Sequence, residues 1–531
     1  MKTIFRFLLI FLFLPLAHLE SQEVSQNLFE NDLPGEHNKE FQFLSFFISQ
    51  GVNSNFYPEN IFMKGQVIGR LFGDNTTRTT DTMTCSYFEQ RILPFFIYQP
   101  KLFNGKAILR ASFEIDFTWG DASYGAGGNL GSAISSDFVN LQTQNIELEL
   151  KPANHWRVNL GLQRLFDTPY NPYRTFFDKM LQTGYRLAFW GTDAVGVSVR
   201  RDMDFSRFKA GFYELYENNV QEDDDVLLGE LHYEKTLSMM WKTGASAYYL
   251  RDRANGEGGV SIYAQGLNSK LCGYNGTFRF DFGNQKYKAD VAWLGTYFSR
   301  NDDFMLDRLK WTGFFNYNLG IADVRAADSV PWKKGADIGG FAANSKIAYR
   351  FGQTENDYIS IDYIYASGDD NGITDKKYSG VITGNTWGAP AGIFIGTGAY
   401  LLFPHGNVVN RYTPAIADLS NMGYGLNAFV FNVSRDFIPN KVKAKAGFAY
   451  ANSVTTPLAG GSHVGTETNM AFSYTLGPYM SLEFHTAYLW LGDFYDSNDD
   501  SYGFDINGGD NISSKPINPW TAFVVFKWLM F

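Results

Sequence analysis

Long hydrophobic runs are scarce in this sequence of 531 residues. Beyond its first segment, no apolar run approaches the roughly 20 residues that a membrane-spanning helix needs, and only 19% of the residues are charged. The mean hydropathy of -0.22 also argues against a helical membrane protein. Strands of about 9–11 residues with alternating apolar and polar side chains can still cross a bilayer.

Cysteine and histidine are also few, at 2 and 7 residues. Cys85 and Cys272 lie far apart and form no C-x-x-C pair, so the sequence predicts neither a disulfide framework nor a zinc site. One disulfide after export and two separate buried thiols both remain open. Ser481 and His485 share a predicted strand but would lie about 13 Å apart, and no G-x-S-x-G motif occurs. We therefore predict no catalytic residues and no enzyme activity.

Positive charge is in deficit overall, with 45 Lys and Arg against 55 Asp and Glu. The net charge of -10 argues against nucleic acid as a partner. Lys2 and Arg6 precede the apolar run FLLIFLFLPLA, a pattern typical of a signal peptide, which we assign to residues 1–21. A membrane-anchor helix is the less favoured alternative. Residues 22–60 are predicted to be a polar lead-in in the periplasm.

Aromatic residues are abundant, with 48 Phe, 31 Tyr and 11 Trp, and they recur in alternating segments from about residue 84. A strand places successive side chains on opposite faces, which a helix cannot do. In residues 107–118 one face carries Ala107, Leu109, Ala111, Phe113, Ile115 and Phe117, and the other carries Arg110, Ser112, Glu114, Asp116 and Thr118. The same alternation recurs near residues 145–151, 156–163, 195–200, 442–448 and 480–490.

Alternation alone does not tell a soluble barrel from a membrane barrel, because the apolar face points inward in one and toward lipid in the other. Aromatic residues near strand ends, such as Trp293, Tyr488 and Trp490, suit the girdle of a membrane barrel. Together with the export signal, they predict an all-β protein in the bacterial outer membrane, surrounded by its lipid. We predict one antiparallel barrel over residues 61–531, with 18 strands favoured, 16 or 20 as alternatives, and a long outer loop at 368–422.

The last segment, WTAFVVFKWLMF at residues 520–531, is predicted to close the barrel. Its better lipid-facing side contains Ala522, Val524, Phe526, Trp528 and Met530, which would turn Lys527 and Phe531 inward, but which face meets lipid stays open. A terminal Phe on the last strand also resembles the assembly signal of bacterial outer-membrane barrels.

A second distinctive stretch begins at Tyr365 with YASGDD, which ends a predicted strand and opens the long loop. This run resembles the alginate-export family of outer-membrane barrels. The resemblance implies an 18-stranded barrel that conducts a polyanionic polysaccharide. Acidic side chains match the basic ones on the predicted lumen face, so polar solutes and an exported polysaccharide are both kept as cargo.

The predicted function is therefore a channel or porin without covalent chemistry, and the alternative is a structural or partner-binding barrel with a blocked lumen. Most lumen charges are expected to pair across strands, and a few unpaired ones at a constriction would set selectivity. The selectivity candidates are Arg110, Glu114, Asp116, Arg157, Arg186, Arg200, Arg279, Lys346, Arg350, Lys443 and Lys445. Lys288, Asp290, Glu467 and Glu483 are also placed in the lumen. Whether the long loop narrows the lumen or caps the outer mouth, and the oligomeric state, stay open.

Two acidic loops are weak candidates for calcium, and no other cofactor is predicted. One contains Asp369, Asp370 and Asp375, and the other contains Asp505 and Asp510. Hard oxygen ligands next to Gly suit Ca²⁺, but neither loop completes the EF-hand pattern. Solvated acidic loops are the favoured interpretation.

Overall fold

The fold is described from a computed structural model. It describes residues 40–58, 77–82, 84–119, 140–165, 192–217, 224–255, 280, 282–301, 304, 306–382, 399–403, 415–416, 420–477, 479–497 and 516–530. The predicted signal peptide lies outside these residues, and so do Arg186, Arg279, Asp505, Asp510 and Phe531.

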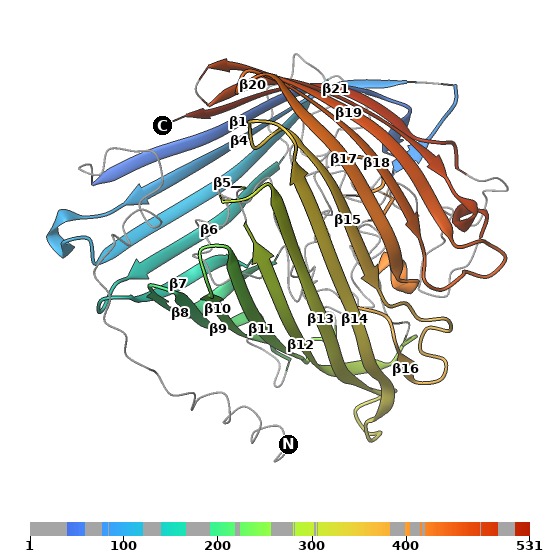
Figure 1. Ribbon diagram of the computed structural model, residues 1–531. Helices are drawn as coiled ribbons and strands as arrows, with labels where there is room; N and C mark the ends of the chain where they lie inside the picture. The colour runs from blue at the N-terminus through green and yellow to red at the C-terminus, as the bar shows by residue number, and fades with distance from the viewer. Residues whose placement is uncertain are drawn as a thin grey trace. The chain divides into compact units, whose positions relative to one another are not determined.

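One large antiparallel sheet forms the wall of a barrel (Figure 1). Within the described residues this sheet has 19 strands, one of which, β16 (Lys377–Tyr378), is a two-residue addition beside β14. The other 18 are β1 (Phe41–Ser54), β4 (Cys85–Tyr98), β5 (Ala107–Trp119), β6 (Asn140–Leu150), β7 (Trp156–Leu165), β8 (Thr192–Met203), β9 (Ser206–Tyr216), β10 (Val226–Thr236), β11 (Trp241–Asp252), β12 (Lys286–Arg300), β13 (Leu309–Arg325), β14 (Lys333–Arg350), β15 (Tyr358–Ala366), β17 (Leu426–Ile438), β18 (Val442–Asn452), β19 (His463–Gly477), β20 (Met480–Leu491) and β21 (Trp520–Met530). The favoured strand number is thus confirmed.

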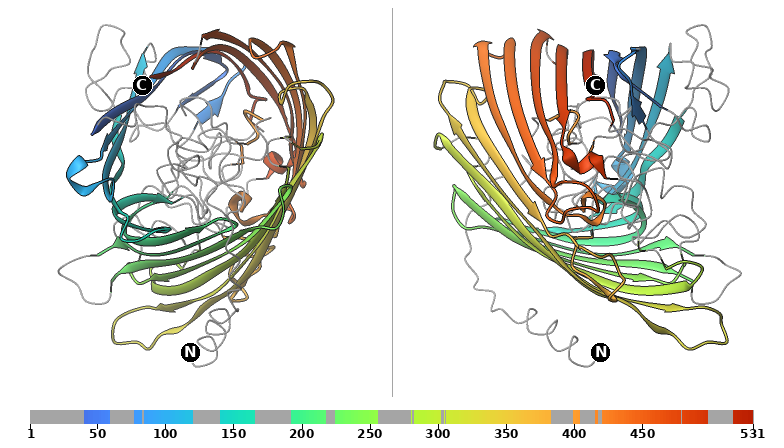
Figure 2. Two further views of the ribbon diagram at one scale, coloured as in Figure 1. Left: turned by 60° about the vertical axis from the view of Figure 1, so that its left-hand side comes forward. Right: turned by 90° about the vertical axis from the view of Figure 1, so that its right-hand side faces the viewer.

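The barrel closes where the first and last strands meet. Ile48 at the centre of β1 lies opposite Lys527 of β21 on one side and opposite Arg91 of β4 on the other. Every other wall strand pairs with its neighbours in the sequence, so the sheet has no free edge. The strands surround a central space in the left view of Figure 2. Closure satisfies the backbone hydrogen bonds that lipid cannot.

Connections at the two ends of the barrel differ in length. Short ones, such as residues 204–205 and 439–441, all lie at one end, and long ones, such as 367–425 and 492–519, lie at the other. The connection at residues 301–308 belongs to the short-turn end, and the one at residues 326–332 belongs to the long-loop end. The even alternation agrees with an outer-membrane barrel whose chain ends lie on the same side.

The start of the barrel corrects our prediction. We placed a periplasmic lead-in before residue 61, but β1 is part of the wall. Phe41 and Phe43 are exposed while Leu44, Ile48 and Val52 are buried, so the strand alternates as the others do. Polar residues on both faces of β1 hid this alternation in the sequence.

The outward face of the wall is apolar. Its exposed side chains include Leu109, Val197, Phe212, Leu294, Phe315, Phe431, Phe472, Phe484, Tyr488 and Trp490. A continuous apolar exterior on a closed barrel places the protein in the bacterial outer membrane, with lipid around the wall. Trp293 does not join the aromatic girdle as predicted, because it is fully buried on the inward face.

The structure decides which face of the closing strand β21 meets lipid, a point that its sequence left open. Val524 and Trp528 are exposed on the lipid side, whereas Phe523, Val525 and Lys527 are buried on the inward side. Lys527 is tolerated there because its ammonium group forms an ion pair with an acidic side chain of the neighbouring strand, as described below.

Smaller elements lie in the connections. They are β2 (Phe56–Pro58), β3 (Thr77–Thr79), and the 3₁₀ turns η2 (Lys101–Phe103), η6 (Asn421–Gly423) and η7 (Asp493–Asp496). No helix in the described part of the chain has the length and apolar character to cross a membrane.

Candidate functional site

Paired charges line the inner face of β5, β6 and β8. The guanidinium of Arg110 lies 3.2 Å from a carboxylate oxygen of Glu147 and 3.4 Å from one of Glu149. Arg200 reaches Glu149 at 3.8 Å and donates from Nε to Asp202 at 2.9 Å. All five side chains are buried from water. The cross-strand pairing expected of lumen charges is thus present on this part of the wall.

A second buried group follows on β9, β10 and β11. Lys209 Nζ lies 2.5 Å from Glu230 Oε1, and the same oxygen accepts a hydrogen bond from the hydroxyl of Tyr213 at 2.8 Å. His232 Nε2 lies 2.6 Å from the hydroxyl of Tyr248. This group is therefore a neutralised network, with each charge held by a partner of opposite sign or by a hydroxyl.

The opposite part of the wall has an excess of positive charge. On β14 and β15, Lys346 lies 3.5 Å from Asp362, whose other oxygen accepts a hydrogen bond from Asn344. Lys443 and Lys445 project inward from β18, and among the described residues neither is in ion-pair contact with a carboxylate. The charges that act most strongly on Lys445 are those of Lys346 and Lys443. Among the described residues, only Lys346 of these three lysines is in ion-pair contact with an acidic side chain.

The carboxylate of Glu483 on β20 contacts three polar side chains. Its carboxylate lies 2.9 Å from Lys527 Nζ and 2.9 Å from His485 Nε2, and it accepts a hydrogen bond from Ser481 at 3.2 Å. Ser481 and His485 therefore meet at Glu483 and not at each other. The pair lacks the direct contact by which a histidine activates a serine nucleophile.

The long connection between β15 and β17 reaches into the barrel. The carboxylate of Glu467, on the inner face of β19, accepts backbone hydrogen bonds from Tyr400 at 2.7 Å, Leu401 at 2.9 Å and Leu402 at 2.7 Å. All three of these loop residues are buried. One fixed carboxylate thus anchors the connection to the wall.

A second anchor of the same connection lies on β12 and β13. The indole N–H of Trp293 donates to the carbonyl of Ile382 at 2.7 Å, and the N–H of Ile382 donates to the side-chain oxygen of Asn318 at 3.1 Å. Tyr378, Val381 and other loop side chains form one buried apolar cluster with the inward side chains of the wall. The buried parts of the connection, such as residues 378–382 and 399–403, therefore lie in the lumen, which was one of the two alternatives left open.

This apolar cluster corrects two placements. Lys288 and Asp290 were expected in the lumen, but they lie on the outer face, where Lys288 approaches Asp323 at 3.7 Å and Asp290 approaches Arg253 at 2.8 Å. The alternating positions on β12 face the buried loop side chains and are apolar. The charged positions consequently point outward near the long-loop end of the barrel.

The other candidates fall in several places. Arg157 lies on the inward side of β7 and donates to the carbonyl of Trp156 at 3.0 Å. Arg350 ends β14 with its guanidinium 5.9 Å from the ring centre of Phe304. Glu114 and Asp116 are in β5, but their side chains are outside the described part of the structure.

The first calcium loop is held by internal hydrogen bonds. Asp369 accepts N–H groups from Asn371 at 3.1 Å and Ser379 at 2.8 Å, and Asp375 accepts one from Lys377 at 2.9 Å. The oxygens of Asp369, Asp370 and Asp375 do not converge on one point. Among the described residues, acidic oxygens converge instead at Glu217, Asp224 and Asp225.

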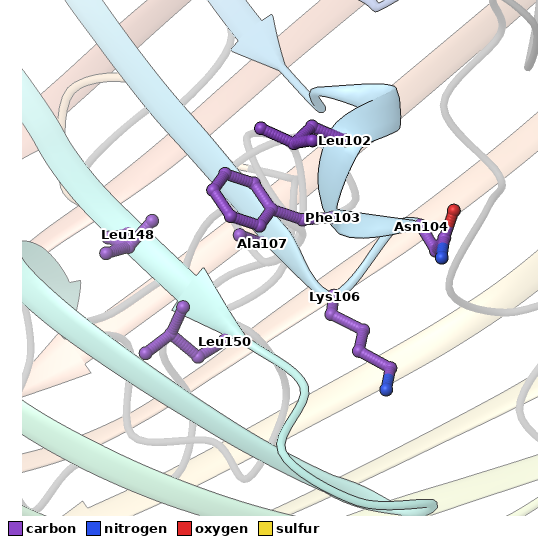
Figure 3. Close-up of a pocket in the computed structure, with 7 residues that line it drawn as sticks. All are labelled: Leu102, Phe103, Asn104, Lys106, Ala107, Leu148 and Leu150. Atoms are coloured by element: carbon purple, nitrogen blue, oxygen red, sulfur yellow. The ribbon is translucent and has the colours of Figure 1, made fainter.

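A hollow of about 490 Å³ lies on the outer surface near the turn between β4 and β5 (Figure 3). It is lined by Leu102, Phe103, Asn104, Lys106, Ala107, Leu148 and Leu150. Ala107, Leu148 and Leu150 alternate with inward charges on their strands, so this hollow faces the surrounding lipid and is not part of the lumen.

Comparison with known proteins found distant structural likenesses. The structure of OccAB4 from Acinetobacter baumannii has 9% identity and a TM-score of 0.45, and it covers 92% of this chain and 98% of that one. The structure of OccK5 (OpdH) from Pseudomonas aeruginosa has 10% identity and a TM-score of 0.43, with the same coverage. Likenesses this distant leave the solutes of this chain unassigned.

No family model matches the sequence. No curated protein matches it either. The resemblance to the alginate-export family that YASGDD suggested is therefore not supported. What the chain itself shows is a closed barrel with an apolar exterior and ion pairs on part of its inner wall, which is the architecture of a porin-type channel.

Proposed function

We propose that this protein is a passive outer-membrane channel for small polar solutes, with a preference for anionic ones. The observation that supports the preference is the group of Lys346, Lys443 and Lys445 on one wall. Asp362 is the single acidic side chain in ion-pair contact with these three among the described residues. Unneutralised lysines along a pore attract carboxylates and repel cations.

Two further acidic side chains of the lumen lie on other strands, β10 and β19. Glu234 accepts from the hydroxyl of Tyr297 at 2.7 Å, and Glu467 accepts from three backbone N–H groups. An equal count of acidic and basic residues in the sequence therefore need not place an acidic partner next to every lysine of the lumen.

The inward connection argues for small solutes and against an exported polysaccharide. Tyr400, Leu401, Leu402 and Phe403 are buried between the loop and the wall, so they reduce the space inside an 18-stranded barrel. The same observation favours a second candidate, a barrel whose lumen is blocked and whose long loops bind a partner.

Planar-bilayer recording with the purified, folded protein tests both candidates. We expect open-channel current and, in a KCl gradient, a reversal potential that favours chloride over potassium. The double variant Lys443→Gln, Lys445→Gln should move this potential toward zero selectivity. Lys235→Gln is the matched control, because Lys235 is exposed on the outward side of β10.

Absence of any current from protein that is folded would contradict the channel and support the blocked barrel. An unchanged reversal potential in the double variant would remove the two lysines from the selectivity hypothesis while leaving the channel intact.

A further inference from the structure

Three carboxylates meet at the long-loop end of β9 and β10. Glu217 directly follows β9, and Asp224 and Asp225 directly precede β10. Tyr216 and Val226 are cross-strand partners, and the register shifts after Val226, so the residues flanking this pair are brought together. One oxygen from each of the three carboxylates lies within 4.8 Å of the other two.

Asp224 is the residue of this group that points to a bound ligand. It is only 6% exposed, and neither of its carboxylate oxygens has a hydrogen-bond partner in the structure. A buried carboxylate without a donor is costly, and proteins normally provide such a group with a counter-charge, a donor or a metal ion. Its nearest charged neighbours in the group are carboxylates, which make its burial less favourable still.

Among the described residues, one positively charged side chain is in ion-pair contact with the group. Arg251 Nη1 lies 3.1 Å from Asp225 Oδ2. Arg251 thus forms an ion pair with one of the three carboxylates. One guanidinium against three carboxylates leaves an excess of two negative charges.

We propose that Glu217, Asp224 and Asp225 bind a divalent cation, and that the cation is Ca²⁺. Carboxylate oxygens without nitrogen or sulfur donors suit hard cations. Ca²⁺ accepts six to eight oxygens at irregular angles and completes its shell with water, whereas Mg²⁺ demands near-octahedral geometry. Glu217 is exposed and Asp224 is buried, so the group offers a mixed, open arrangement that suits Ca²⁺ better.

The site goes beyond the proposed channel function, because it lies at the rim and does not require passage of solute. A bound ion would join the end of β9 to the start of β10 and stabilise the long-loop end of the barrel. The lumen residues Lys443 and Lys445 take no part in it.

Isothermal titration with CaCl₂ tests the site. The full barrel should be refolded from denatured chains into detergent, because native outer membranes carry lipopolysaccharide that binds Ca²⁺ itself, and then freed of metal with EDTA. We expect one saturable site in the wild type. Loss of a ligand should weaken it at least about tenfold, since loss of residues that only support a ligand already costs about 10–100-fold.

Two variants and one control make the test specific. Asp224→Asn removes the buried charge, and Glu217→Gln removes an exposed ligand with little risk to folding; both should lose affinity. Glu214→Gln is the matched control, because Glu214 is an exposed acidic residue near the group that is not one of its ligands. Heat-modifiable migration in SDS gels confirms that each variant is folded.

Three results would overturn the proposal. They are the absence of saturable Ca²⁺ binding to the wild type, wild-type affinity in both folded ligand variants, and an affinity for MgCl₂ equal to that for CaCl₂. A weakening in Glu214→Gln as large as in Asp224→Asn would also count against it, because diffuse surface charge would then explain the binding.

Discussion

Asp357 is the residue that closes the short turn between β14 and β15. Its carboxylate accepts backbone N–H groups from Gln353 at 3.0 Å and Thr354 at 3.2 Å in the turn, and from Asp436 at 2.9 Å on β17. Burial alone would raise the pKa of Asp357, but the three backbone hydrogen bonds to the charged form outweigh it. The pKa of this carboxyl is therefore lowered.

We predict that Asp357→Asn destabilises the barrel by about 1.5–3 kcal/mol at neutral pH, the range for hydrogen bonds to a charged group. Because the folded-state pKa is depressed, the contribution is fully present above the unfolded pKa of about 3.9 and is lost as the pH falls through the folded pKa. Guanidinium unfolding in lipid vesicles should show the wild type and the variant converging at low pH. Glu355→Gln, in the exposed part of the same turn, should unfold like the wild type, and a difference that persists unchanged into acid would contradict the assignment.

Period-two alternation predicted which residues share a face but could not always tell which face is inside. It placed Arg110, Arg200, Lys443 and Lys445 on the inner face, where the structure has them. It misplaced Lys288 because the inner face of β12 packs against loop side chains and is apolar. The group of Glu217 and Asp224 was beyond the sequence, since it depends on the register between two strands across their connection.

Among the elements, the connection between β15 and β17 depends on Glu467 for its position. Three backbone N–H groups of the connection end on this one carboxylate. The side-chain amide of glutamine has only one oxygen to accept these hydrogen bonds. Its NH2 group would also face the backbone N–H groups, and two donors cannot form a hydrogen bond with each other. The connection should therefore loosen when the charge is removed.

We predict that Glu467→Gln lowers the free energy of unfolding by about 1–3 kcal/mol, because buried N–H groups lose an acceptor. Single-channel recordings should show a larger and noisier conductance, since Tyr400 to Leu402 would no longer be held at one position. Thr468→Val changes the next, outward-facing residue and should leave the current unchanged. Wild-type conductance in a folded Glu467→Gln channel would show that this contact does not control the constriction.

Element boundaries were predictable wherever polar and apolar positions separate cleanly, as in β5 and β20. They failed at β1, where Ser45, Gln50 and Ser54 are buried alongside apolar residues. The inward path of the 367–425 connection could not be derived either, because an apolar stretch such as 399–403 can equally be expected to pack inside the lumen or over its mouth. The contacts of the connection with Glu467 and Trp293 show that its buried parts lie inside the lumen.

At the scale of the whole molecule, the same amphipathic strands could have formed a soluble barrel with its apolar side inside. The predicted export signal and the aromatic strand ends favoured lipid, and the structure agrees, with apolar side chains covering the outside and ion pairs within. The outer face is therefore where a charge should be least tolerated. The cost should also depend on depth, since the ends of the strands lie near water.

Phe431 and Asn427 allow the cost of an outward-facing charge to be measured at two depths on one strand. Both are exposed on the outward side of β17, Phe431 near its middle and Asn427 at its long-loop end. We predict that Phe431→Arg costs about 2–4 kcal/mol and Asn427→Arg only about 0–1 kcal/mol, as expected for arginine at the midplane and near the interface. Guanidinium titration of the barrel in phospholipid vesicles measures both values. Equal, small costs at the two positions would mean that the middle of this face meets water, and the outer wall could then not be the lipid-facing surface of a transmembrane barrel.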